Sequence, residues 1–145
     1  MDVVSSVGAV VGLVFNFATA IKTCNDIRGR YKDADRTIGS IRHELETLQG
    51  ALQGLANLMM HDASALTSRW DTNKMLPGTF ERAVRGFRRT IRGLQDDMEP
   101  LRGIGRLGKM DKVKMIWNED GMKEHLVQLR AQSSALQLLL LVLQT

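Results

Sequence analysis

Apolar residues recur along this chain at alternating steps of three and four residues, within four long segments. Such spacing places them along one face of an α-helix, because the helix turns once in about 3.6 residues. The four stripes cover residues 3–24, 38–59, 80–98 and 122–143. No segment sustains an alternation of apolar and polar residues with a period of two, so we expect no β-strands. The pattern predicts an all-α fold, a four-helix bundle in which the stripes pack against one another.

The stripes also predict which side chains form the core. Truncation of a buried leucine to alanine costs about 2–5 kcal/mol, so these positions should matter most for stability. We expect Trp117, which ends a short basic segment, to cover one end of this core. The residues expected to be buried are Leu45, Leu48, Leu52, Phe87, Ile91, Leu94, Leu126, Leu129 and Leu136.

Helix-breaking residues mark the expected boundaries between the helices. Residues 29–32 separate the first two stripes, and residues 61–78, which end in Pro-Gly, are expected to form a long loop. Thr79 is then the expected N-cap of the third helix, because its hydroxyl can accept a hydrogen bond from a free N–H group. Pro100 is expected to end or kink that helix, because proline lacks the N–H group that a helix interior needs.

A glycine-rich segment follows the third helix. Gly103, Gly105 and Gly108 match the G-x-G-x-x-G pattern of phosphate-binding loops. That pattern holds a phosphate only when a strand precedes it and a helix opens directly after it, and the sequence predicts neither. We therefore interpret the segment as a flexible connection. A short extra helix or turn over residues 112–117 is expected before the last long helix.

The remaining candidates for chemistry are isolated side chains. His43, His61 and His125 lack the spacing of metal ligands and are expected on the surface. The acidic residues within 96–99 are expected at a solvated helix end, because acid–base catalysis needs carboxylates held in a cleft. Cys24 is the only cysteine, so no internal disulfide forms, as is typical of an intracellular protein. We expect no catalytic residue, no metal and no cofactor.

The composition is that of one ordinary globular domain. The chain has 145 residues, of which 43% are hydrophobic and 25% charged, and a chain of this kind buries a core without disulfides or metals. Its formal net charge is +4, which raises the question of a nucleic-acid partner. No recognition motif is present and aromatic residues make up only 5%, so we expect no nucleic-acid binding.

Positive charge is concentrated on the third helix. Arg82, Arg85, Arg89 and Arg92 recur at steps of three and four, opposite the apolar stripe of that helix. Two interpretations are open. The arginines form either an ordinary solvated face or a surface that attracts anionic lipid headgroups, to which each basic residue contributes about 1 kcal/mol.

The first helix carries no charge between Asp2 and Lys22. A run of this length reaches the lower limit for spanning a bilayer, about 17–25 residues. It is a helix buried in the bundle, or a signal peptide cut after residues 18–20, or a segment that packs in the soluble protein and enters a membrane on a trigger. Asp2 stands against the signal peptide, which usually begins with positive charge. Gly8 and Gly12 fit the third interpretation, because small residues four apart let helices approach closely in lipid.

The third interpretation also predicts how the first helix packs in the soluble protein. The apolar faces of the first helix should then be buried, because exposing so long an uncharged helix favours aggregation. After release, the same helix would meet lipid or a partner helix. The residues expected to insert or to form contacts between copies are Val7, Gly8, Val11, Gly12 and Phe15.

Segments at the two ends of the chain form a recognisable layout. Residues 2–14 form a hydrophobic opening rich in glycine, alanine and valine, followed by a leucine-rich second helix. Residues 112–117 form a basic turn that ends in tryptophan, and residues 124–138 carry E-x-L-x-x-L and a Ser-Ser-Leu-rich run. This layout resembles the HeLo-like domain, a fungal N-terminal domain of STAND and NOD-like receptor proteins. The resemblance covers essentially the whole chain, except residues 61–78 and the polar residues 118–121.

The resemblance implies a single domain over residues 1–145, the N-terminal part of a longer protein, with a fold similar to the executioner bundle of the mixed-lineage kinase domain-like necroptosis protein. It implies a role in regulated cell death, in which copies oligomerise and permeabilise membranes through the first helix, with Gly8 and Gly12 in its glycine motif.

Partners and localisation follow from the same resemblance. The implied partners are other copies of the chain, anionic membrane lipids and a homotypic receptor domain, and the implied location is the cytoplasm, with recruitment to the plasma membrane on activation. The alternative is an oligomerisation or adaptor module of a fungal NOD-like receptor that never lyses a membrane.

Overall fold

The computed structural model describes residues 2–29, 32–102 and 119–144. Within these residues the chain is all-helical and contains no strand, as the sequence predicted. The helices are α1 (Val3–Ile27), α2 (Lys32–His61), α3 (Ala63–Thr72), α4 (Leu76–Arg102) and α6 (Glu119–Gln144).

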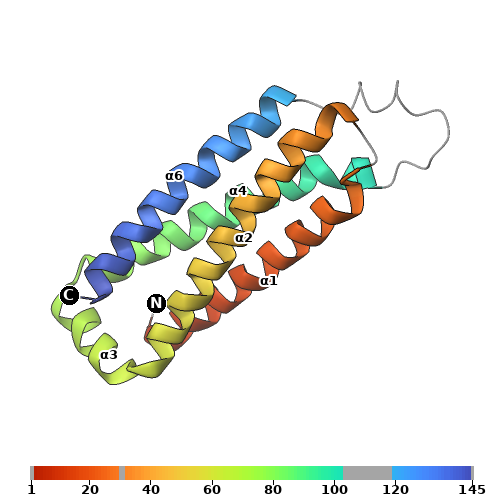
Figure 1. The fold of residues 1–145 in the computed structure, drawn as a ribbon. Helices are drawn as coiled ribbons and strands as arrows, with labels where there is room; N and C mark the ends of the chain where they lie inside the picture. Colours follow the sequence, from red (N-terminus) through yellow and green to blue (C-terminus); the bar gives the residue numbers. More distant parts are fainter. Residues whose placement is uncertain (1, 30–31, 103–118, 145) are drawn as a thin grey trace.

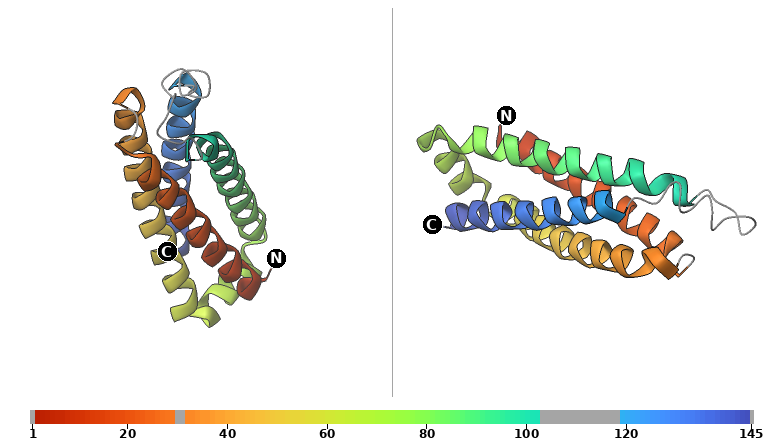
Figure 2. Two further views of the ribbon diagram at one scale, coloured as in Figure 1. Left: turned by 90° about the vertical axis from the view of Figure 1, so that its right-hand side faces the viewer. Right: turned by 90° about the horizontal axis from the view of Figure 1, so that it is seen from above.

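The four long helices lie side by side, and α3 lies at the end where both chain termini are found (Figure 1). α1 packs against α2 and α4, and α6 packs against the same two helices. The turned views in Figure 2 show the same arrangement from the end and from above. Each long helix therefore has two principal neighbours and leaves its remaining side to solvent.

α1 begins at an acidic cap and ends at a glycine. The Asp2 carboxylate accepts a hydrogen bond from the Ser5 N–H at 2.7 Å, which satisfies one of the free N–H groups of the first turn. At the other end Gly29 has a φ of +82°, a left-handed conformation that favours glycine. The Gly29 N–H donates to the Asp35 carboxylate at 2.9 Å. The chain therefore leaves α1 at the boundary that the sequence predicted.

The predicted long loop over residues 61–78 is wrong, because α3 occupies most of it. Asp62 caps this helix and accepts a hydrogen bond from the Ala65 N–H at 3.2 Å. Leu66 and Trp70 are its buried residues, and the Trp70 ring meets Phe80 edge-on with 5.4 Å between ring centroids. Two buried side chains one turn apart dock this short helix, and so few apolar positions give little periodic signal in the sequence.

The predicted boundaries of the third long helix also need correction. α4 begins at Leu76, so Thr79 is not its N-cap but lies in its first turn, where its hydroxyl donates to the Met75 carbonyl at 3.0 Å. Pro77 is tolerated there because the first turn has no helical partner for its missing N–H group. The helix also continues through Pro100 to Arg102.

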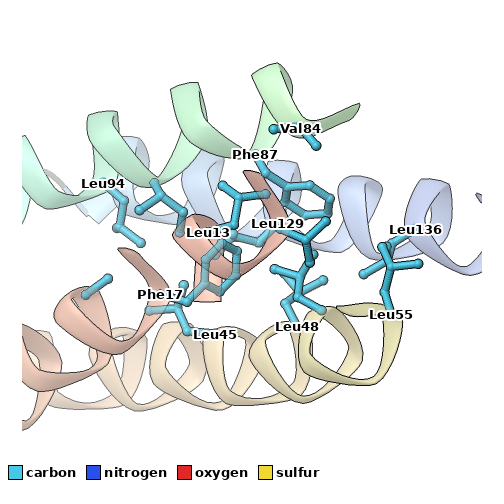
Figure 3. Packing of buried hydrophobic residues seen from close by; sticks show 14 of the residues in the cluster. Leu13, Phe17, Leu45, Leu48, Leu55, Val84, Phe87, Leu94, Leu129 and Leu136 are labelled. Atoms are coloured by element: carbon cyan, nitrogen blue, oxygen red, sulfur yellow. The ribbon is translucent and has the colours of Figure 1, made fainter. Parts of the chain in front are cut away.

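The core contains every residue that the stripes predicted for it. Figure 3 shows leucines and phenylalanines from all four long helices in contact. Phe17 of α1 and Phe87 of α4 meet edge-on, with 6.0 Å between ring centroids. Trp117 and the short extra helix or turn predicted over residues 112–117 lie outside the described residues.

Polar side chains connect α1 to its neighbours at four positions along the helix axis. Three of the four ties fall near the C-terminal end of the helix, between residues 23 and 26. They are Gln49 to the Val14 carbonyl (3.2 Å), Gln95 to the Thr23 hydroxyl (2.9 Å), Arg42 to the Asn25 side-chain oxygen (2.9 Å) and Arg102 to the Asp26 carboxylate (3.1 Å).

α6 is held by a second set of polar ties. They are Gln132 to the Thr90 hydroxyl (2.6 Å) and the Gly86 carbonyl (3.1 Å), His125 to Asp97 (2.6 Å) and Arg130 to Glu44 (3.2 Å). The first two residues reach α4 and the third reaches α2. Each of these bonds forms only when the two helices are at one particular position along their axes. The contacts therefore set the register of α6 against both neighbours.

Candidate functional site

One face of α1 is exposed along most of its length. Phe15 is 68% exposed and Val4 is 80% exposed, although both side chains are apolar. Gly8 and Gly12 lie on the same side of the helix and are also exposed, and a Cβ atom added at either glycine would meet nothing within 4 Å. This face, defined by Val4, Gly8, Gly12 and Phe15, is called the α1 face below.

The expectation that the apolar faces of α1 are buried is wrong for the α1 face. Of the five residues expected to insert or to contact another copy, Gly8, Gly12 and Phe15 are exposed, whereas Val7 and Val11 are half-buried against the core. The physical reason is that α1 has only two principal neighbours, α2 and α4. Between Asp2 and Lys22 the sequence supplies no charged residue for the side that they leave uncovered.

α1 is long and apolar enough to cross a membrane by length and composition, and it is the helix within the described residues that passes this test. Only 28% of its most apolar 18-residue window is buried. The core helix of a soluble protein also passes such a test but is mostly buried. A signal sequence passes it too, and α4 is buried to a similar extent as α1, so the low burial follows from packing against two principal neighbours.

The four arginines predicted to share a face of α4 do so. Arg82, Arg85, Arg89 and Arg92 are all exposed, and Arg88, which the sequence analysis did not include, is exposed beside them. These five residues are called the arginine face. Arg85 pairs with Glu81 at 3.3 Å, and Arg82 donates to the Thr79 hydroxyl at 3.4 Å.

The other three residues of the arginine face, Arg88, Arg89 and Arg92, form no ion pair with any residue that the structure describes. Their guanidinium groups are therefore available to an external anion. Arg88 was not predicted to belong to the arginine face because it lies at the edge of that face nearest α1, beside the buried stripe of α4. Its spacing of three residues from Arg85 and four from Arg92 was the available signal.

A cleft of ≈ 380 Å³ lies between α1 and α4, and two residues of the arginine face line it. α1 contributes Asn16 and Thr19 to its walls, and α4 contributes Arg88 and Arg92. The remaining lining residues are Ile91, Gln95 and Asp96. The cleft therefore has an uncharged polar wall on α1 and a wall with two cations on α4.

A second apolar surface lies on α6, on a side that the sequence analysis did not single out. Leu138 is 68% exposed and Leu141 is 63% exposed, and Val142 is exposed beside them. A neighbouring groove between α2 and α6 is lined by Ala51, Gly54, Asn57, Leu58, His61 and Leu140. None of these side chains is acidic, lysine or arginine, so the surface suits contact with another apolar surface.

The three histidines lie in different surroundings. His43 and His61 are exposed as expected, but His125 is not a surface histidine: its side chain is 16% exposed and its Nε2 lies 2.6 Å from Asp97 Oδ2. The expectation failed because His125 falls on the side of α6 that packs against α4. No group of three or more His, Cys, Asp or Glu side chains in the described residues is arranged to hold a metal ion.

The acidic residues at the end of α4 are exposed, as expected. Asp96, Asp97 and Glu99 do not share a cleft, because Asp97 contacts His125 whereas Glu99 pairs with Arg102 at 3.5 Å. Burial raises the pKa of the Cys24 thiol to about 12, so this group remains a protonated core side chain near neutral pH.

The glycine-rich segment at residues 103–108 lies outside the described residues. The candidate surfaces within the described residues are the α1 face, the arginine face, the cleft between α1 and α4 and the apolar surface of α6. Comparison of the chain with known protein families, with curated proteins and with solved structures finds no match.

Proposed function

We propose that this chain is a HeLo-like domain, a four-helix bundle that signals or executes regulated cell death. Copies self-associate and target or permeabilise anionic membranes through α1. The domain works without catalysis or a cofactor and without nucleic acid. It resides in the cytoplasm and moves to the plasma membrane on activation, alone or with a homotypic domain of a receptor.

The observation that carries the proposal is the position of the α1 face next to the arginine face. An amphipathic surface binds a bilayer when apolar side chains enter the acyl boundary and cations beside them meet anionic headgroups. Phe15 supplies an exposed apolar side chain, and Arg88 and Arg92 lie on the adjoining wall of α4. Both components are present on one side of the molecule before any rearrangement.

Insertion of α1 is the second step of the proposal. The helix carries no charge from Val3 to Ile21, and a charged residue at the middle of a membrane-spanning helix costs about 2.5–3.5 kcal/mol. Gly8 and Gly12 are already free of neighbours, so another helix can approach the α1 face closely at these positions. The membrane-bound oligomer is proposed to form through contacts between α1 helices at these two glycines.

The test compares two apolar-to-acidic substitutions at exposed positions. Phe15→Glu alters the α1 face, whereas Val127→Glu alters an equally exposed position, 63% exposed, on α6. Neither should unfold the protein, because exposed substitutions usually change stability by within about 0.5 kcal/mol. We expect Phe15→Glu to abolish co-sedimentation with phosphatidylglycerol vesicles and dye release from them, and Val127→Glu to leave both unchanged. Equal effects of the two substitutions, or a wild type that prefers oligonucleotides to vesicles, would contradict the proposal.

A second candidate function is an adaptor that oligomerises without touching lipid. The observation that favours it is the apolar surface of α6, where Leu138 and Leu141 are exposed away from the arginine face. A second copy of the chain is the occupant we consider, because an uncharged apolar patch is complementary to itself across a two-fold axis. Leu138→Gln with Leu141→Gln should then convert a lipid-free oligomer into a monomer in sedimentation velocity experiments, and a monomeric wild type contradicts this alternative.

A further inference from the structure

We propose that the cleft between α1 and α4 binds the phosphodiester group of one lipid headgroup, held mainly by Arg88 and Arg92. The inference rests on the proposed membrane function and deepens it, because it assigns headgroup recognition to one site instead of the whole arginine face. Asn16 and Thr19 form the opposite wall of the same cleft.

The charge of the cleft suits this ligand. Arg88 and Arg92 are one helical turn apart and have no acidic partner within the described residues, and a guanidinium group offers paired N–H donors to phosphate oxygens. Asp96 also lines the cleft and opposes a strongly negative ligand. Two positive charges and one negative charge match a singly charged phosphodiester better than a doubly charged free phosphate.

The neutral side chains of the cleft add directional contacts. The Asn16 side chain makes no hydrogen bond to any other described residue, so its amide is free to donate. The Gln95 amide nitrogen is already committed to the Thr23 hydroxyl at 2.9 Å and to Glu99 at 2.7 Å. Its Oε1 atom is buried without a partner in the described structure. Gln95 is therefore held by these bonds as part of the cleft wall, and the free directional contact comes from Asn16.

The position of the cleft fits a lipid that remains in its bilayer. Thr19 lies one helical turn after Phe15 on the same side of α1, and Phe15 is exposed on the α1 face. A phosphodiester in the cleft therefore places its acyl chains next to the apolar side of α1. The same position would hold the first helix at the bilayer surface before it inserts.

The test uses two double variants with the same change of charge. Arg88→Gln with Arg92→Gln removes both cations of the cleft, and Arg82→Gln with Arg89→Gln removes two cations of the same face outside it. All four residues are exposed, and thermal unfolding checks that both variants fold. We expect the cleft pair to weaken binding to phosphatidylglycerol vesicles at least tenfold more than the outer pair. Asn16→Leu should weaken it about tenfold without any change of charge, as loss of a hydrogen bond to a charged group does.

A second experiment, with soluble ligands, distinguishes binding in the cleft from binding to a membrane surface. Glycerophosphoglycerol, which is the headgroup phosphodiester without acyl chains, and inorganic phosphate are titrated while backbone amide resonances are followed by NMR. We expect saturable shifts at Asn16, Thr19 and Arg92 that are larger for the phosphodiester than for phosphate.

Each outcome is decisive. If the wild type binds vesicles and both double variants lose the same affinity, the cleft is not a site and the membrane function stands. If the wild type ignores vesicles but the phosphodiester shifts the cleft resonances, the cleft is a site for a free phosphodiester and the membrane function fails. If neither probe binds, both proposals are wrong.

Discussion

Gln132 of α6 donates its side-chain amide to the Thr90 hydroxyl of α4 at 2.6 Å. The same amide donates to the Gly86 carbonyl at 3.1 Å, so one side chain is bonded to two successive turns of the facing helix. A shift of either helix by one residue would break both bonds. This pair therefore fixes the height of α6 against the helix that carries the arginine face.

Replacing Gln132 should destabilise the protein more than replacing another glutamine of the same helix. Gln132→Ala removes both hydrogen bonds and leaves part-buried acceptors on α4, a loss of about 1–3 kcal/mol. Gln137→Ala is the control, because Gln137 is exposed and should change stability by within about 0.5 kcal/mol. Urea unfolding followed by circular dichroism measures both. Equal midpoints for the two variants would show that the bonds contribute nothing to stability.

Truncation should destabilise the protein at one leucine of α6 and have little effect at another. Leu129 is fully buried, and Leu129→Ala leaves a cavity in the core that costs about 2–5 kcal/mol. Leu138 is 68% exposed, so Leu138→Ala should change the free energy of unfolding by within about 0.5 kcal/mol. Thermal or urea unfolding checks this pair. Similar losses at both positions would mean that α6 packs through a different face.

Substitution of Gly8 and Gly12 should separate folding from membrane activity. A Cβ at either position meets nothing within 4 Å, so alanine fits and should stabilise the helix by about 1 kcal/mol per site. Leucine at both positions should also leave the protein folded, because the α1 face faces solvent.

We expect the double leucine variant to bind anionic vesicles but to release less dye, since close approach between inserted helices is blocked. Unfolding on heating is measured on the same samples. A folded leucine variant with full dye release would show that the two glycines have no role between copies.

Cys24 should resist modification in the folded protein. Burial raises the pKa of its thiol from 9.0 to about 12, and only the thiolate reacts readily with iodoacetamide. Mass spectrometry should find no alkylation at pH 8 in buffer and complete alkylation in denaturant.

The raised pKa of Cys24 also predicts a pH dependence of stability. The neutral thiol is favoured in the folded state, so its contribution is fully present below pH 9 and is lost as the pH rises towards 12. Urea unfolding across this range should show a decline that is smaller in Cys24→Ala. A decline of the same size in the variant would assign it to other groups.

The long helices were predictable because one pattern repeats over many turns. Each stripe contributes enough apolar side chains, such as Leu45 and Leu94, that its helical period stands out in the sequence. α3 was missed because only Leu66 and Trp70 of its residues are buried. The one clear sequence signal for α3 was its N-cap, Asp62. A single capping residue does not predict a helix when no apolar stripe follows it.

The candidate surfaces were predictable only in part. Spacing alone places Arg82, Arg85, Arg89 and Arg92 on one side of a helix, because that relationship lies within a single element. The cleft joins Asn16 of α1 to Arg88 of α4, and this depends on how far each helix is rotated about its own axis. Periodicity also could not reveal that the α1 face is uncovered, since the same apolar residues suit a helix enclosed on all sides.

The uneven distribution of polar ties along α1 has a mechanical consequence. Near the C-terminal end, Thr23, Asn25 and Asp26 are each bonded to a neighbouring helix, whereas residues 3–13 are held by apolar packing without such a bond in the described structure. Peeling the helix from its N-terminus therefore breaks directional bonds last. Amide hydrogen exchange should accordingly show a gradient along α1, fastest at its start. The helix is therefore anchored at its C-terminal end, and its N-terminal stretch without such bonds, residues 3–13, is about 15 Å long.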